Sequence, residues 1–148
     1  MPAPADDAVG PAPVHVAPAP SARRAQTAID GGVAFALAML AWPFPLARSM
    51  LTPVAHVASV FLFWYLMQIA YSSVTMAVWG ATAGTRLMGF AVLSADGTSP
   101  GRRQRLIWGA ISGAMTPVRA VVPPRVGERD VPDAAARVEV VLVTSAGR

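Results

Sequence analysis

Residues 54–79, with the sequence VAHVASVFLFWYLMQIAYSSVTMAVW, decide the fold of this chain. They contain no charged side chain, and the uncharged stretch around them extends from Ser49 to Thr85. A helix of this length reaches about 39 Å, which exceeds the roughly 30 Å thickness of the hydrocarbon core of a bilayer. Trp79 stands where an interfacial aromatic side chain is expected. The stretch therefore predicts a transmembrane helix.

A second apolar run precedes this one at residues 29–47, and only Asp30 interrupts it. Its length of about 28 Å just crosses the hydrocarbon core, so we expect a second transmembrane helix. Pro43 and Pro45 lie in its last turns, where proline kinks or ends a helix.

A third apolar run begins at Leu106 and is shorter than the other two. Thirteen residues precede Arg119, and Pro117 interrupts the helical pattern. Two interpretations of residues 106–122 stay open. They form either a tilted third span in which Arg119 reaches the membrane surface, or a short or re-entrant helix.

The composition agrees with a membrane protein and excludes several other classes. Of 148 residues, 54% are hydrophobic and 14% are charged, with a mean hydropathy of +0.47, whereas about a quarter of the residues of a soluble domain are charged. The sequence pI near 11 is typical of nucleic-acid-binding proteins. Here the arginines flank the apolar runs, so we expect no nucleic-acid partner. The absence of cysteine rules out a disulfide framework, and we expect neither a metal nor a cofactor.

The segments outside the apolar runs set the domain boundaries. Residues 1–22 hold six of the fourteen prolines, and we expect them to form a disordered tail. The membrane domain then covers residues 23–144, and residues 145–148 form a second tail.

Two short β-rich runs lie within this membrane domain, from Phe90 to Ala95 and from Val138 to Thr144. The first ends at the turn dipeptide Asp96-Gly97. We expect the two runs to pair as a small cytoplasmic β-ribbon, which favours the re-entrant interpretation of the third apolar run. The predicted fold is an all-α membrane protein with two transmembrane helices, a third short or re-entrant hydrophobic helix and this ribbon.

The placement of the arginines predicts the orientation. If two helices span the membrane, six arginines lie on the same side as the N-terminus and the loop that follows the second span. Arg48 alone lies on the opposite side. Because arginine is enriched in cytoplasmic loops, we expect a cytoplasmic N-terminus. The six are Arg23, Arg24, Arg86, Arg102, Arg103 and Arg105. The last three form a basic cluster that we expect to contact anionic lipid head groups.

Small residues recur at the intervals that allow helices to pack closely. Gly80 with Gly84, and Gly109 with Gly113, each fit the GxxxG pattern. They predict a compact bundle or a homo-oligomer.

Polar side chains form a stripe on the central apolar helix. The stripe consists of Gln68, Tyr71, Ser72 and Thr75. Such a stripe is typical of hydrogen bonds between helices, and a pathway for a solute is the alternative. His56, near the start of the same helix, is interpreted as an interfacial residue.

Arg23 and Asp30 are seven residues apart, which places both on one face of a helix. An acidic residue at the edge of a membrane is costly unless it has a partner, so Asp30 is a candidate functional site. The alternative is a carboxylate at a helix start, stabilised by the local amide dipole and by Arg23 or another arginine.

Several of these residues belong to one pattern. Arg23 and Asp30 open the first apolar run, and the block GATAGTRLMGFAV at residues 80–92 follows the second. In this arrangement the chain resembles the RDD family of small bacterial membrane proteins, which carries a G-x-T-x-G-K-[KR]-x-x-G-x-x-V signature at that place. Thr85 stands where a basic residue is commoner. The matching positions are Gly80, Thr82, Gly84, Arg86, Gly89 and Val92.

The resemblance extends to the C-terminal region. Residues 132–141, PDAAARVEVV, stand where the family has H-D-x-x-A-G-T-x-V-V. The family's name refers to an arginine and two aspartates, and the resemblance makes Asp133 the second of these aspartates. Pro132 replaces the histidine, and Arg137-Val138 replaces Gly-Thr. The resemblance implies a multi-pass protein of the bacterial cytoplasmic membrane and permits a role in ion or solute transport.

Two functions follow as hypotheses. The chain has no Ser/His/Asp set, no Cys/His pair and no phosphate-binding glycine loop next to a lysine, so we expect no enzymatic activity. The first hypothesis is a non-enzymatic accessory or scaffold subunit of an envelope or transport complex. The alternative is an oligomeric ion or small-solute transporter that uses Asp30 as a titratable site within the membrane.

Overall fold

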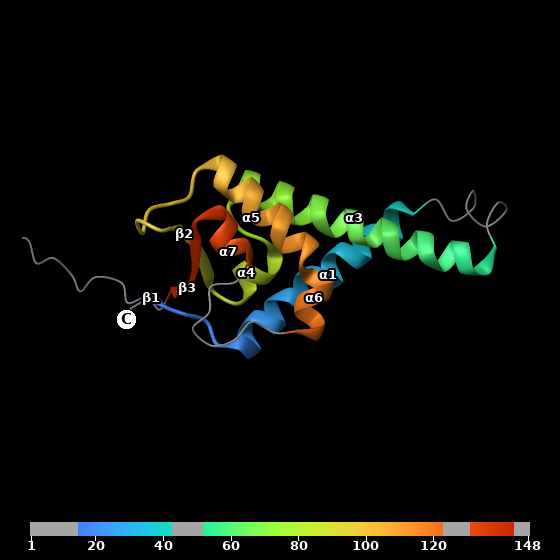
Figure 1. Cartoon of the computed structure of the whole chain (residues 1–148), viewed down its shortest axis with the longest axis horizontal. Helices are drawn as coiled ribbons and strands as arrows, with labels where there is room; N and C mark the ends of the chain where they lie inside the picture. The colour runs from blue at the N-terminus through green and yellow to red at the C-terminus, as the bar shows by residue number, and fades with distance from the viewer. Residues whose placement is uncertain (1–14, 43–51, 123–130, 144–148) are drawn as a thin grey trace, which may run out of the picture.

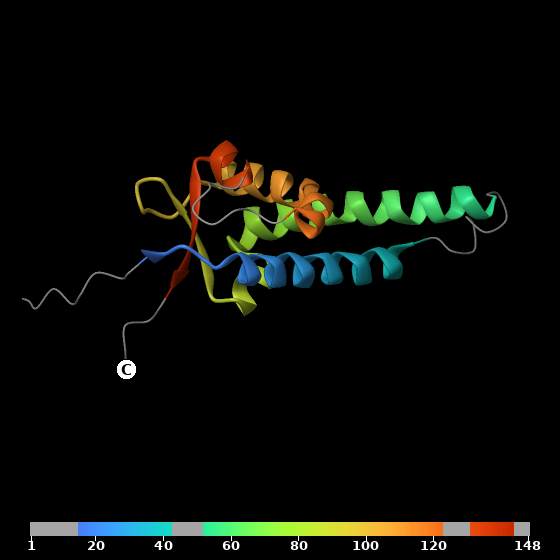
Figure 2. The same ribbon diagram turned by 60° about the horizontal axis from the view of Figure 1, so that its bottom comes forward.

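A computed structural model describes residues 15–42, 52–122 and 131–143. The described chain is mostly helical and has two parts (Figure 1). The first part is a long hairpin made of α1 (Pro20–Ala41) and α3 (Pro53–Trp79). The second part, called the head, consists of α4 (Ala83–Leu87), α7 (Val131–Ala136), β1 (His15–Val16), β2 (Phe90–Ser94) and β3 (Val138–Val143). The two hairpin helices run side by side in opposite directions, and the head lies at one end of them (Figure 2).

The helix predicted at residues 54–79 is confirmed as α3, which is a candidate membrane span. Among the described residues, α3 is the one helix that is long and apolar enough to cross a membrane. Only 6% of its most apolar window is buried within the protein, whereas the core helix of a soluble protein would be covered. Large apolar side chains such as Phe61, Leu62 and Leu66 are therefore exposed on its surface. Lipid is the solvent that suits such a surface.

The first helix differs from the expected span of residues 29–47. It begins at Pro20, because proline is favourable in the first turn of a helix, where no backbone N–H is needed. Residues 43–47 lie outside the described residues. The first turns of α1 carry Arg23, Arg24 and Asp30, which makes this helix less apolar than α3.

The expectation of a disordered tail through residue 22 is wrong for its last part. Residues 15 and 16 form β1, which pairs antiparallel with β3, and residues 20–22 belong to α1. The pairing with β3 supplies hydrogen bonds that proline-rich composition alone does not reveal. Residues 1–14 and 145–148, the remaining parts of the two expected tails, lie outside the described residues.

The predicted β-ribbon is confirmed. Strands β2 and β3 pair antiparallel with Phe90 opposite Leu142 and Val92 opposite Val140, and β1 adds a third, short strand beside β3. The turn after β2 is closed by Asp96, whose carboxylate accepts hydrogen bonds from the hydroxyl and the amide of Thr98, at 2.7 and 3.1 Å. These two donors hold the pKa of Asp96 below its ordinary value.

The third apolar run forms two short helices instead of one continuous helix. Helix α5 covers Arg102–Ala114, and α6 covers Thr116–Val121. The helices are separated at Met115, and Pro117 lies in the first turn of α6. At about 20 Å, α5 is too short to cross a bilayer. The structure thus contradicts a single tilted helix over residues 106–122, while α7 and β3 place the chain after α6 back in the head (Figure 1).

Close packing between α3 and α5 depends on two glycines. A Cβ atom on Gly109 would lie 2.5 Å from the carbonyl oxygen of Ser72, and one on Gly113 would lie 2.8 Å from the Cα of Ile69. Neither distance is sterically possible, so the two backbones approach as closely as they do only because these positions lack side chains. This GxxxG pair packs within one chain.

The other predicted packing pair does not form a helix face. Gly80 ends α3 in the left-handed conformation, with φ of 70°, and Gly84 lies in the separate helix α4. The expectation of a shared GxxxG face for these two residues is therefore wrong. A sequence interval of four implies a common face only where the helix is continuous.

The core of the head lies between its sheet and the ends of α3 and α5. Trp108 of α5 is fully buried there, together with Met76 of α3. The sheet contributes Phe90, Val92, Val138 and Val140, and α7 contributes Ala136.

Candidate functional site

Asp30 lies inside the protein, with its side chain directed at the start of α4. It is 6% exposed. One carboxylate oxygen, Oδ1, accepts hydrogen bonds from the Gly84 amide at 2.8 Å and from the Tyr71 hydroxyl at 3.3 Å. The other, Oδ2, accepts a hydrogen bond from the Thr82 hydroxyl at 2.7 Å. Three donors from two elements therefore stabilise the charge of a buried carboxylate.

The local sequence explains why these donors converge on Asp30. The left-handed Gly80 ends α3, and Thr82 then caps α4. Thr82 and Thr85 form a capping box, in which each side chain accepts a hydrogen bond from the other residue's amide. Thr85, which stands where the family more often has a basic residue, is completely buried. The capping box leaves the Gly84 amide free to donate to Asp30.

Tyr71 connects α3 to the same site. Its hydroxyl accepts a hydrogen bond from the Ala83 amide at 2.9 Å and donates one to Asp30. The Asp30 junction, defined as Asp30, Tyr71, Thr82 and Gly84, thus joins α1, α3 and α4.

Gly84 is required by the closeness of α1 and α4 at this junction. A Cβ atom at this position would lie 2.5 Å from the carbonyl oxygen of Gln26 and 2.8 Å from Asp30 Oδ2. Any larger residue would push α4 away from α1 and lengthen the hydrogen bonds to Asp30.

Arg23 binds the second aspartate of the family pattern. Its guanidinium donates to Asp133 Oδ2 at 2.7 Å, and the two side chains are 13% and 6% exposed. The indole of Trp108 donates to Asp133 Oδ1 at 2.7 Å. Helices α1, α5 and α7 are therefore connected through a single carboxylate.

This geometry corrects the expected stabilisation of Asp30. The partner of Arg23 is Asp133, and the amides near Asp30 belong to the start of α4, while Asp30 itself lies in the middle of α1. Seven residues on one helix place the two side chains on one face, but about 10 Å separates their backbones, which is enough for each to reach a different element.

The other signature and basic residues lie nearer the surface. Arg86 is exposed at the end of α4, and Gly89 takes a left-handed conformation before β2, with φ of 67°. Arg102 and Arg103 are exposed at the start of α5, whereas Arg105 is half-buried and donates to the Pro100 carbonyl at 2.8 Å. The structure does not bring these arginines to Asp30.

The polar stripe of α3 faces the interior of the protein, where α3 packs against the other helices. Gln68 is 1% exposed and donates to Ser72 at 3.3 Å, and Thr75 donates to the Tyr71 carbonyl at 2.7 Å. The Gln68 Oε1 atom is buried and has no hydrogen-bond partner within the described part of the chain. His56 lies near the other end of α3, where its ring contacts that of Trp42 edge to face.

Sequence reasoning did not single out two residues of these clusters. Trp108 stands in an apolar run, and nothing in that run distinguishes an indole that donates to a distant aspartate. The backbone of Gln26 lies close to Gly84, but glutamine one turn before Asp30 gives no signal of that contact. Within the described residues, no group of three or more histidine, aspartate or glutamate residues could hold a metal ion.

The fold and these clusters define a small, mostly helical protein with one candidate membrane-spanning helix, in which buried ionic groups connect the helices. The chain belongs to the RDD family, whose sequence pattern matches residues 17–115. No curated protein and no solved structure matches the chain. Membership suggests a location in the membrane and contact with the lipid bilayer. The matched region includes the Asp30 junction and Arg23, while Asp133 lies beyond it.

Proposed function

We propose that this protein is a non-enzymatic accessory subunit that presents its head to a partner protein of the bacterial cell envelope. One observation carries this proposal. Arg23, Asp30 and Asp133, the arginine and the two aspartates of the family pattern, all bind other parts of the same chain. Asp30 fastens α4 to α1, and the Arg23–Asp133 pair fastens α7 to α1. Buried ionic connections of this kind favour one defined arrangement of the head relative to the hairpin.

In this proposal the hairpin spans the cytoplasmic membrane and the head lies on the cytoplasmic side. The arginine distribution supports that orientation, since Arg48 is opposed by six arginines near the head. The shortness of α5 and the return of the chain to β3 support a re-entrant α5–α6 unit that enters from the same side. The exposed arginines of α4 and α5 then lie near the phosphates of the inner leaflet.

Site-specific photo-crosslinking in cells tests the accessory role. A photoreactive residue in place of Glu139 in the head, or of Arg103 at the exposed start of α5 beside it, is expected to crosslink to one recurring partner. The same residue in place of Leu62, on the exposed surface of α3, is the control for contacts made within the membrane. Arg23→Gln, which loosens α7, should lower the head crosslinks severalfold without lowering the amount of protein in the membrane. Equal crosslinking from all positions, or none from the head, contradicts the proposal.

One observation favours transport as a second candidate function. Asp30 is a buried acidic residue beside a half-buried tyrosine. On the same helix as that tyrosine, the Gln68 Oε1 atom has no hydrogen-bond partner among the described residues. Buried polar groups at membrane depth mark ion and proton pathways in many transporters. An oligomer would have to complete the pathway, because a single hairpin is too small to enclose one.

Reconstitution into liposomes separates the two candidates. Transport predicts an ion or proton flux that Asp30→Asn abolishes and that Asp96→Asn, a substitution of an exposed turn aspartate, leaves unchanged. The accessory role predicts no flux from the purified protein. A flux that survives Asp30→Asn contradicts the assignment of Asp30 to the pathway.

A further inference from the structure

A stripe of α1 other than the one that carries Asp30 borders a cavity. Arg24 and Ala28 are four residues apart, and so are Thr27 and Gly31, which is the spacing of neighbours on a helix face. These four residues line a partly open cavity of about 410 Å³. Its volume falls in the range of small-molecule sites, which is roughly 300–1,000 Å³. The cavity exists because Ala28 and Gly31 have little or no side chain to fill it.

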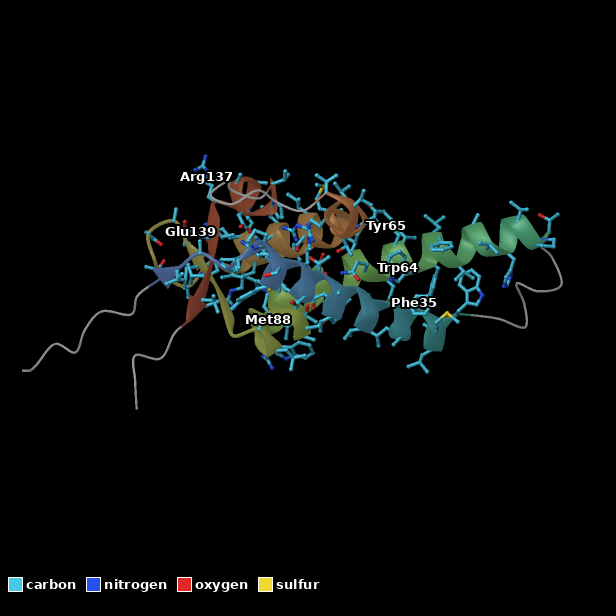
Figure 3. The ribbon with its side chains drawn as sticks, turned by 90° about the horizontal axis from the view of Figure 1, so that it is seen from below. Phe35, Trp64, Tyr65, Met88, Arg137 and Glu139 are labelled. Carbon is cyan, nitrogen blue, oxygen red and sulfur yellow. The ribbon has the colours of Figure 1, made fainter. Side chains whose placement is uncertain are left out.

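Two other helices complete the wall. Arg119 of α6 lines the cavity and is 7% exposed, with its guanidinium donating to Ser112 at 2.9 Å. Trp64 of α3 lines it too, and its indole donates to the Gly31 carbonyl at 3.3 Å. Figure 3 shows Trp64 on the helical part of the protein, away from the head residues Arg137 and Glu139.

The charges of the lining have one sign. Arg24 and Arg119 contribute guanidinium groups, and none of the lining residues that the structure describes is acidic. Arginine binds phosphate through paired hydrogen bonds in addition to charge attraction. Arg24 precedes Gly31 by about 10 Å along the axis of α1, on the side nearer the head. The described lining therefore combines two guanidinium groups with the small apolar surface of Ala28 and Gly31.

We propose that this cavity binds one anionic phospholipid from the leaflet next to the head. Its phosphate lies between Arg24 and Arg119, and the upper part of one acyl chain lies along Ala28 and Gly31 beside Trp64. This arrangement matches the order of an anionic head group and an apolar chain in a membrane leaflet. The inference requires the hairpin to lie in the membrane, but it requires neither the accessory role nor the transport role.

Native mass spectrometry of the delipidated protein in detergent tests the proposal. Added phosphatidylglycerol is expected to bind with a stoichiometry of one, in preference to zwitterionic phosphatidylcholine. Arg24→Gln should weaken this binding about fivefold, because one arginine near the membrane surface raises the affinity for anionic lipid by about that factor. Ala28→Leu keeps every charge and fills the cavity, so it should reduce binding at least as much.

Arg137→Gln is the matched control, because it removes the same charge from an exposed position that lies outside both the cavity and the basic cluster of α5. It should bind phosphatidylglycerol like the unaltered protein, and thermal unfolding should show that Ala28→Leu remains folded. Three results would overturn the proposal. They are equal binding of the two lipids, unchanged binding by both cavity variants, and an equal loss in Arg137→Gln, which would indicate diffuse charge attraction.

Discussion

Asp30 and Asp133 are buried, Arg23 is partly buried, and each of the three has a hydrogen-bond partner from a distant part of the chain. Burying such charges is favourable only while their partners stay in place. Asp133→Asn keeps the size of the side chain but leaves the Arg23 guanidinium without a counter-charge. We expect the free energy of unfolding in detergent to fall by about 3 kcal/mol, the lower end of the range for buried pairs, because 13% of Arg23 remains exposed.

The control for this substitution is Glu139→Gln, which changes an exposed acidic residue of β3 in the same way. It should alter the free energy of unfolding by less than about 0.5 kcal/mol. A comparable loss in both variants would show that the Arg23–Asp133 pair contributes no more than a surface charge.

A second prediction compares Gly84, which belongs to the Asp30 junction, with Gly32, which lies close to Asp30 in the sequence but outside the junction. Gly84→Ala places a methyl group 2.5 Å from the Gln26 carbonyl oxygen, so it should lower the free energy of unfolding by about 1–3 kcal/mol. Gly32→Ala, in the middle of α1, meets nothing within 4 Å and should raise it by roughly 0.5–1 kcal/mol. Thermal unfolding of both variants in one detergent measures the opposite signs. The same sign for both would exclude close packing as the reason for Gly84.

At this scale the sequence predicts which residues matter better than it predicts their partners. The spacing of Arg23 and Asp30 correctly places them on one face of α1, but it carries no information about which element approaches that face. The partner of Arg23 is 110 positions away in the sequence. The interaction of Asp30 with the start of α4 depends on a turn after α3 that only the folded backbone reveals.

At the scale of elements, the contact between α3 and α5 offers a direct test. Gly109→Ala puts a Cβ atom against the Ser72 backbone, so α5 must move outward. We expect hydrogen exchange of the amides in residues 102–114 to become about tenfold faster or more, which corresponds to a loss of ~1.4 kcal/mol within the range for overpacking. Gly101→Ala, just before α5, has ordinary space around its Cβ position and should leave the exchange nearly unchanged. Equal exchange rates in the two variants would contradict the close contact.

The elements were predictable where their pattern is local. Helix α3 and the two paired strands follow from an uncharged run and from short β-rich runs, and both were placed within a few residues. The start of α1 and the break at Met115 could not be predicted. A proline in the first turn of a helix and a proline inside a helix look alike in a sequence. Strand β1 exists only through its pairing with β3, which composition cannot indicate.

At the scale of the whole molecule, the hairpin and the head have different surfaces. The hairpin exposes large apolar side chains such as Phe35 and Leu66. The head exposes Arg137, just before β3, and Glu139 within it, and Figure 3 shows both away from Phe35. A protein with such a division is stable when lipid surrounds one part and water surrounds the other. The proposed function therefore requires a hairpin that crosses the bilayer, with the head on one side and the loop between α1 and α3 on the other.

Single-cysteine labelling of spheroplasts measures that arrangement directly, because the native sequence contains no cysteine. Ala95→Cys and Glu139→Cys report on the head, and Thr52→Cys reports on the start of α3 beside the hairpin loop. With a membrane-impermeant maleimide, we expect Thr52→Cys to react in intact spheroplasts and the two head variants to react only after permeabilisation. Reaction of all three from the same side of the membrane would contradict a hairpin that spans it.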